Sequence, residues 1–414
     1  MTIHPELWRI LSKAGSRGLL PFPCDLPKDT IGKKRIYAVD MMVLLKSLAR
    51  SIDKAVPADA QNPKPDQCWF EPLVQAVISR FRSILKKHSP RMLVGCFDKG
   101  VPASKREETE KRDRQRKVLA DTVQFDEKTG LWSGAGLPPI QQACEMLVGD
   151  RRLRPLFHKW IVHRLFYHGD GQPIDWGSVV MLEYMDGSPS SNNLDGTASP
   201  FLEAEHALVA IGKKFPDHVL MVDCDDGDMV PILMRHVVAT RQRVIWFKHP
   251  KTHSNNEPYI ETYDANRFVL GLFDSGYHCL QVELACMLCG NDYAKKDVFS
   301  RGIGCKFVLE AVQHCVKAGL CWHTGKLLAE EPKDAVKRVY DWQAAQTPLL
   351  ESALSELVHI CFLAKHIKGG GVKSWYSDAK LVRNNSNEFT CHGLREAFRK
   401  FAPAIRAWRG LEWT

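Results

Sequence analysis

Three short apolar runs, each ending in aspartate, constrain the fold of this chain more than any other feature of its sequence. The runs are RIYAVD at 35–40, RMLVGCFD at 91–98 and HVLMVD at 218–223. Uninterrupted apolar runs of this length are typical of strands buried inside a sheet. The segments between them include helical repeats, such as the one from Phe70 to His88. This alternation predicts an α/β fold, with a mostly parallel sheet flanked by helices on both faces.

Later segments extend the pattern. Three further strands are expected at 178–185, 243–248 and 257–263. The segment 201–212 has the spacing of a helix, which we expect to begin at Pro200 with Ser199 as its N-cap. From Asp264 onward the apolar residues recur at helical spacing. The parallel sheet is therefore expected to lie in the part of the chain before that point.

Carboxylates gather where the predicted strands end. Asp40 and Asp98 end the first two runs, and a crowd of acids follows the third, at Asp223, Asp225, Asp226 and Asp228. Taken singly, a strand-ending aspartate is more often a helix cap than a ligand. Parallel strands, however, end at one edge of a sheet, where α/β folds place their sites. If the segment is extended, Asp226 and Asp228 point the same way. Such a cluster predicts a hard divalent cation, with Mg²⁺ the commonest where the substrate is a phosphate ester.

Charge and cysteine usage restrict the class of protein. The chain has 57 Lys and Arg against 48 Asp and Glu, a formal charge of +9. A basic surface around an acidic pocket suits a polyanionic substrate.

Thirteen scattered cysteines indicate free thiols in a reducing compartment, and the C-x-x-C at 286–289 lacks the second pair that a zinc site needs. No apolar run approaches the roughly 20 residues of a membrane helix. We expect an intracellular protein of the nucleus or cytoplasm, without a membrane partner.

Five segments occur in a telling order: YAVD, CFDKGVPASKREETEKRDRQR, EAEHA, DCDDGDMV and CGNDYAKKDVFSRGIGCK. In this order they resemble the motifs of the flap endonuclease/XPG family of structure-specific 5′ nucleases. The resemblance covers about residues 1–120 and 198–320. It implies a PIN-like core with a twisted, mostly parallel sheet over 1–275. It also implies a helix-hairpin-helix-like duplex-binding element at 276–320, followed by a helical C-terminal extension at 321–414.

The resemblance assigns roles residue by residue. The metal-holding acids of the family match Asp40, Asp98, Glu203, Glu205, Asp226, Asp228 and Asp292. The basic residues that reach the scissile phosphate in the family match Lys105 and Arg112. Nucleic-acid contacts are implied at Arg116, Gly302, Gly304 and Lys306. Asp225 falls on a further acidic position, whereas Asp223 has no counterpart and is expected to tolerate substitution.

The implied activity is two-metal hydrolysis of phosphodiester bonds at 5′ flaps or ends of DNA. Asp40, Asp98, Glu203 and Glu205 would hold the first Mg²⁺, and Asp226, Asp228 and Asp292 the second. Mn²⁺ would be a substitute, and a monovalent cation is expected at the hairpin 301–306. The sequence after residue 320 contains no recognisable peptide of the kind that binds a sliding clamp.

Three alternatives stay open. Residues 118–197 match no flap-endonuclease arch, and EAEH at 203–206 resembles a motif of the 5′→3′ exoribonucleases. An mRNA endonuclease of the viral host-shutoff type shares the same core, and a large-DNA-virus source would add the virus particle as a location. A non-catalytic nucleic-acid-binding relative is the third, although all seven matched acids are present. The sequence leaves open DNA against RNA and endonucleolytic against exonucleolytic action.

Overall fold

The computed structural model describes two compact units. The residues it describes are 3–21, 26–27, 30, 33–55, 70–98, 124–133, 140–150, 152–183, 203–248 and 260–277, with single positions at 279, 282, 285, 286, 289, 305, 306 and 309. The β1 unit comprises the described residues from 29 to 224, and the α8 unit comprises those up to 28 and from 225 onward. Each unit is described by itself below.

Four parallel strands form the sheet of the β1 unit, in the order β5-β2-β1-β6. They are β1 (Arg35–Asp40), β2 (Met92–Cys96), β5 (Val179–Glu183) and β6 (Val219–Asp223). In this register Asp40 pairs with Cys96 of β2 and Val39 with Asp223 of β6. Every residue of β6, and every residue of β1 after Arg35, is buried. Their uninterrupted apolar sequence follows from this, because neither face meets water.

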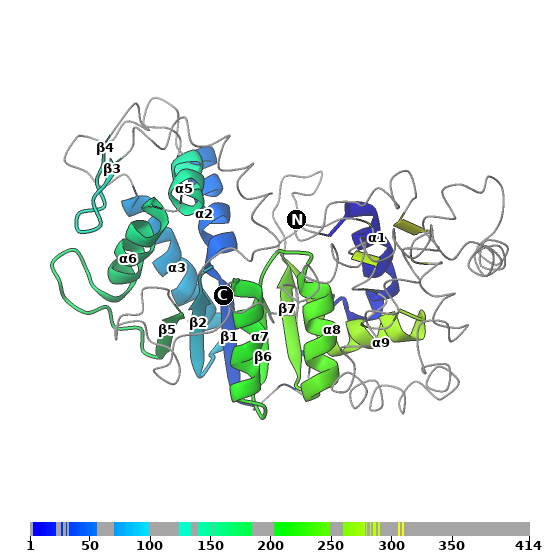
Figure 1. The fold of residues 1–414 in the computed structure, drawn as a ribbon. Helices are drawn as coiled ribbons and strands as arrows, with labels where there is room; N and C mark the ends of the chain where they lie inside the picture. Colours follow the sequence, from blue (N-terminus) through cyan, green and yellow to red (C-terminus); the bar gives the residue numbers. More distant parts are fainter. Residues whose placement is uncertain are drawn as a thin grey trace, which may run out of the picture. The chain divides into compact units, whose positions relative to one another are not determined.

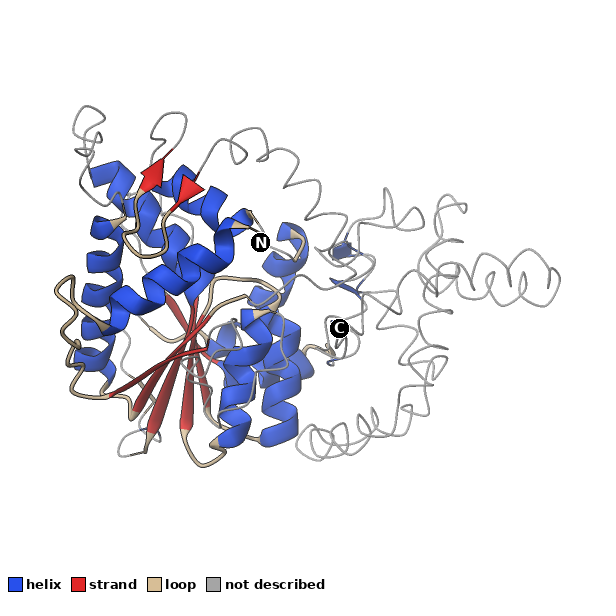
Figure 2. Cartoon of the chain, turned by 60° about the vertical axis from the view of Figure 1, so that its left-hand side comes forward, coloured by secondary structure: helices blue, strands red, loops and turns tan. Residues whose placement is uncertain are grey.

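Helices cover this sheet on both faces (Figure 2). They are α2 (Met41–Ala55), α3 (Glu71–His88), α5 (Ile140–Gly149), α6 (Leu153–Phe166) and α7 (Ala204–Lys214). The α2 and α3 helices connect β1 to β2, whereas α7 carries the chain from β5 back across the sheet to β6. Right-handed crossovers in opposite directions place α7 on the face opposite α2 and α3. Figure 1 shows α7 packed over β1 and β6. The order therefore reverses between β1 and β6, which is where open α/β sheets bind their ligands.

A small hairpin adds to the β1 unit and was not predicted. It pairs β3 (Gln124–Phe125) with β4 (Trp132–Ser133), in antiparallel fashion. Phe125 joins a cluster of aromatic rings with Phe70, Phe157 and Trp160. The turn needs Gly130, whose φ is 71° and where an added Cβ would lie 2.4 Å from the Trp160 ring. Two-residue strands leave too little alternation for a sequence pattern to reveal.

The described part of the α8 unit includes two antiparallel strands and three continuous helices. The strands are β7 (Val244–Lys248) and β8 (Glu261–Asp264), and the helices are α1 (Pro5–Ala14), α8 (Met229–Thr240) and α9 (Ala265–Asp274), with a short 3₁₀ turn at Ser16–Gly18. The rings of Trp8, Trp246, Tyr263 and Phe268 form its aromatic centre. The sequence did not predict α8, because a helix that is apolar on nearly all sides has no amphipathic period.

The predicted fold class is confirmed, since the sheet of the β1 unit is parallel and flanked by helices. The predicted start of α7 is wrong. The helix begins at Ala204 with Glu203 in the N-cap position, and Ser199 and Pro200 lie outside the described residues. Of the predicted element at 276–320, the structure describes residues 276, 277, 279, 282, 285, 286, 289, 305, 306 and 309, and the extension at 321–414 lies wholly outside the described residues. No helix within the described ranges is long and apolar enough to cross a membrane.

His158 of α6 makes the β1 unit sensitive to acid. The ring is 2% exposed and lies 4.6 Å, centroid to centroid, from the ring of Phe97. Burial, aided by the nearby charge of Arg154, lowers the pKa of His158 from 6.5 to about 3. Below pH 6.5 the unfolded chain binds a proton at this position that the folded chain does not bind. Folding stability is therefore lost as the pH falls from about 6.5 toward 3.

Replacing His158 by Leu, a residue of similar volume, should make stability less dependent on pH. Between pH 7 and about pH 4.5, the wild type should lose about 2–3 kcal/mol more free energy of unfolding than His158→Leu does. Urea unfolding at the two pH values measures the difference, and acids elsewhere affect both proteins alike. Identical losses in the two proteins would contradict the assigned role of His158.

Candidate metal centre

The two carboxylate oxygens of Asp40, at the end of β1, have different hydrogen-bond donors. Its Oδ1 accepts hydrogen bonds from the amides of Met42 at 2.9 Å and Val43 at 3.0 Å, and so caps α2. Its Oδ2 accepts a hydrogen bond from the Cys224 thiol, 3.3 Å away at the end of neighbouring β6. The carboxylate is buried. The helix-cap reading of Asp40 is thus correct for one oxygen, while the other faces the point where the strand order reverses.

Asp98, two residues beyond β2, supplies the cap that Ser199 was expected to supply. Its Oδ1 accepts a hydrogen bond from the amide of Ala204, the first residue of α7, at 3.0 Å. Within the part of the chain that the structure describes, this is the hydrogen bond that Asp98 makes, and its side chain is partly exposed. One carboxylate oxygen of Asp98 is therefore available to a cation.

Glu203 and Glu205 follow at the start of α7. Glu203 has an extended backbone, with φ −115° and ψ 144°, and its side chain makes no capping hydrogen bond although it is 8% exposed. Glu205 lies in the first turn. On a regular helix the two side chains would point apart, but the extended backbone of Glu203 removes that constraint. The positive end of the helix dipole favours both carboxylates.

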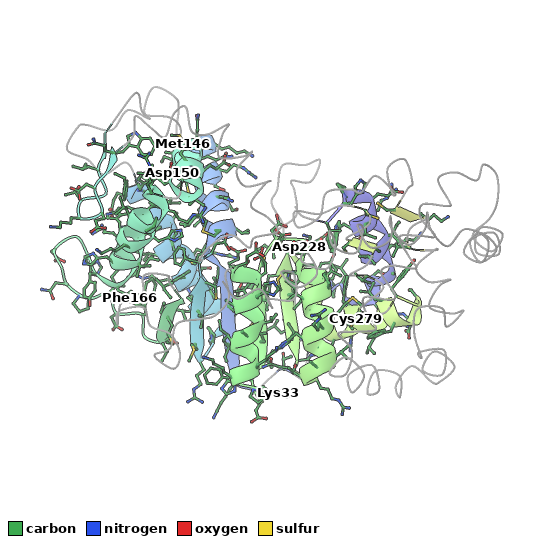
Figure 3. The ribbon with its side chains drawn as sticks, viewed as in Figure 1. Lys33, Met146, Asp150, Phe166, Asp228 and Cys279 are labelled. Carbon is green, nitrogen blue, oxygen red and sulfur yellow. The ribbon has the colours of Figure 1, made fainter. Side chains whose placement is uncertain are left out.

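The acids of the α8 unit lie in a turn, not in an extended strand. The Oδ1 of Asp226 accepts a hydrogen bond from the amide of Asp228 at 3.0 Å. Asp228 has helical dihedral angles, φ −63° and ψ −17°, in the N-cap position of α8, where Figure 3 labels it. The expectation that Asp226 and Asp228 align as alternate residues of a strand is wrong. An Asx turn at Asp226 starts the helix instead.

Lys248 holds this turn, and the sequence analysis did not single it out. Its Nζ donates a 2.7 Å hydrogen bond to the carbonyl oxygen of Asp225 and lies 3.4 Å from the Asp225 carboxylate. The ammonium also lies 4.7 Å from the ring centroid of Trp8 and 5.5 Å from that of Trp246. Lys248 is 5% exposed, which is unusual for a lysine. The signal in the sequence was a lysine at the end of an apolar strand.

Asp223 has a structural role, contrary to the expectation that it tolerates substitution. Its Oδ2 accepts hydrogen bonds from the Tyr37 hydroxyl at 2.9 Å and from Arg80 at 3.3 Å. Burial, followed by the charge of Asp223, raises the pKa of Tyr37 well above its ordinary value of 10. Because strand side chains alternate, Asp223 faces Arg80 of α3 while the next residue, Cys224, faces Asp40. Asp223 is therefore no candidate ligand.

The structure divides the predicted site residues into three groups. The β1 unit holds Asp40, Asp98, Glu203 and Glu205, and the α8 unit holds Asp226, Asp228 and Lys306. The remaining predicted residues lie outside the described ones: Lys105, Arg112, Arg116, Asp292, Gly302 and Gly304.

Among the described residues, no three of the predicted acids bring their oxygens within 4.8 Å of one another. Mg²⁺ usually keeps several water ligands and takes only one or two carboxylates directly, so it does not require such crowding. Asp40, Asp98, Glu203 and Glu205 offer only oxygen atoms, which are the donors that Mg²⁺ takes.

Comparisons with known proteins add a likeness at the level of solved structures. No protein-family model matches the chain, and no curated protein matches it. The chain is similar to T5 5′-exonuclease with bound divalent metal ions (zinc), at 13% identity and a TM-score of 0.35, over 84% of this chain and 99% of that one. It is similar over the same shares to a bacteriophage T5 flap endonuclease in a pseudo-enzyme-product complex with DNA and metal ions, at 12% identity and a TM-score of 0.35. The residues of this chain therefore carry the functional proposal.

Replacing Asp223 by Ala should destabilise the protein, because Tyr37 and Arg80 lose their buried acceptor. We expect a loss of about 1–3 kcal/mol in the free energy of unfolding, and about 1 kcal/mol for Tyr37→Phe. Denaturant unfolding of both variants, with the partly exposed Asp225→Ala as control, measures this. An Asp223→Ala variant as stable as the control would contradict the structural role.

Proposed function

We propose that the chain is a divalent-metal-dependent phosphodiesterase that cuts nucleic acid, and specifically a structure-specific 5′ nuclease acting at 5′ flaps or ends of DNA. One observation carries the proposal. Asp40, Asp98 and the Glu203/Glu205 pair all occur at the carboxyl edge of one parallel sheet, at the ends of β1 and β2 and the start of α7. The five ordered motifs of the sequence support it independently.

The charge of this edge is the reason to invoke a metal ion. Asp40 and Asp98 lie at or just after the ends of neighbouring strands, and like charges brought to one edge of a sheet repel one another. The capping roles of Asp40 and Asp98 need no negative charge, because Asn or Ser caps a helix equally well. A sequence that nonetheless keeps acids at both positions, and adds Glu203 and Glu205, gains from a cation bound among them.

The proposed roles follow the motifs. Asp40, Asp98, Glu203 and Glu205 hold one Mg²⁺, and Asp226, Asp228 and Asp292 hold a second, with Mn²⁺ as a substitute. When bound, such ions lower the pKa of an attacking water and neutralise the scissile phosphate. Lys105 and Arg112 steady that phosphate as its negative charge grows. Arg116, Gly302, Gly304 and Lys306 contact the nucleic-acid backbone, and the enzyme acts inside the cell.

Asp98→Asn is the sharpest test, because an Asn carbonyl can still accept the hydrogen bond from Ala204. The full chain should cleave a labelled 5′-flap DNA in the presence of Mg²⁺. The substitution should slow cleavage at least about 100-fold, since loss of even an outer-shell partner costs 10–100-fold, while leaving the melting temperature nearly unchanged. A wild-type chain that binds the flap but never cuts it, across a range of Mg²⁺ and Mn²⁺ concentrations, would disprove the enzymatic proposal.

A parallel assay on single-stranded, 5′-phosphorylated RNA distinguishes the substrate class. Preference for the DNA flap supports the 5′ nuclease proposed here. Preference for the RNA, with the same dependence on Asp98, would replace it by an RNA-directed nuclease that uses the same acids.

Lys248 is proposed to position the turn that carries Asp226 and Asp228. Lys248→Met removes the ammonium but keeps the stem, so the turn loses its tie at the carbonyl of Asp225. The Mg²⁺ concentration for half-maximal cleavage should rise about 10-fold or more. Lys248→Arg keeps a donor and should retain most of the wild-type response. An unchanged Mg²⁺ requirement in Lys248→Met would show that the turn does not depend on this lysine.

A further inference from the structure

A different set of potential metal ligands meets in the α8 unit. It consists of His4 in the N-cap position of α1, Glu6 in the first turn of that helix, and Cys305. One ligand atom from each lies within 4.8 Å of those of the other two. Cys305 is buried, whereas His4 and Glu6 are partly exposed. No predicted nuclease residue belongs to this set.

Two hydrogen-bond donors of the cluster converge on one acceptor nitrogen. Nδ1 of His4 accepts a 3.3 Å hydrogen bond from the amide of Glu6, and the Sγ of Cys305 lies 3.2 Å from the same Nδ1. The nitrogen offers a single lone pair when the ring is neutral, so an N–H and an S–H donor compete for it. Histidine is also not among the preferred N-cap residues. Two of the three potential ligand atoms, Sγ of Cys305 and Nδ1 of His4, thus already lie side by side.

We propose that His4, Glu6 and Cys305 bind a Zn²⁺ ion, with water as its fourth ligand. Nitrogen, sulfur and carboxylate oxygen are the donors that zinc takes, and the binding of a metal displaces the thiol proton. The usual Zn–S and Zn–N bond lengths put the two atoms of a tetrahedral site about 3.5 Å apart. The separation of 3.2 Å between Cys305 and His4 is close to that value. A thiolate and a carboxylate together neutralise the ion, which offsets the unfavourable positive end of the α1 dipole.

This site is of a different kind from both cation sites considered above. The nuclease acids offer only oxygen, and so would a hairpin that binds a monovalent cation. Nor does it involve Cys286 and Cys289, the C-x-x-C pair that lacks partners. The ion would tie α1 to a segment 301 residues away in sequence, next to Lys306. The proposal does not depend on nuclease activity.

Cobalt provides a test that the nuclease acids cannot imitate. Co²⁺ enters zinc sites, and only a thiolate ligand gives the intense sulfur-to-cobalt charge-transfer absorption in the near ultraviolet. The full chain, stripped of metal with a chelator and then titrated with Co²⁺, should develop this band and lose it when Zn²⁺ is added. Cys305→Ser should abolish the band. Cys279→Ser, which alters another buried cysteine of the same unit, should leave it intact.

His4→Asn guards against misfolding, because Asn is a good N-cap and preserves the start of α1. It should weaken Co²⁺ binding at least about 10-fold while the melting temperature of the metal-free protein stays near that of the wild type. The proposal is overturned if the wild type gives no charge-transfer band, or if the band survives in Cys305→Ser. It is also overturned if the band disappears equally in Cys279→Ser, because a different thiolate would then be the ligand.

Discussion

One long-range hydrogen bond determines where the acids of the β1 unit stand. The amide of Ala204 donates to Asp98, which joins the end of β2 to the start of α7 across 106 residues of sequence. Because the first amides of a helix have no acceptor within the helix, this bond favours a helix start at Ala204. Glu203 and Glu205, on either side of Ala204, are thereby brought to the same sheet edge as Asp40. Asp40 and Asp98 each cap a helix with one carboxylate oxygen, and their second oxygens lie at the same sheet edge.

Local pattern was enough to find the strands of the parallel sheet, because burial on both faces leaves a clear run of apolar residues. The run at 35–40 is β1 to the residue, and that at 218–223 differs from β6 only at its first position. The start of α7 was missed for the opposite reason. Its cap comes from Asp98, which lies too far away in the sequence for a local pattern to indicate it. The same holds for Asp223, whose partners Tyr37 and Arg80 lie 186 and 143 residues away.

The sequence indicated candidate members of the site but not their conformation. Residue type and order indicated Asp226 and Asp228, yet their shared Asx turn depends on the helix that follows, which the sequence pattern concealed. Lys248 was missed because a lysine at a strand end normally reaches solvent. Here the rings of Trp8 and Trp246 shield its ammonium, which donates a hydrogen bond to the backbone of the acidic turn.

Asp223, the last residue of β6, and Cys224, the residue after it, also help to specify the register of the sheet. Asp223 faces Arg80 and Tyr37, while Cys224 faces Asp40 from the opposite side of the strand. A slip of one residue would exchange them, since the side-chain period of a strand is two. It would bring a second buried carboxylate against Asp40 and leave Arg80 opposite a thiol. Misaligned pairing of β6 with β1 is therefore penalised electrostatically as well as by packing.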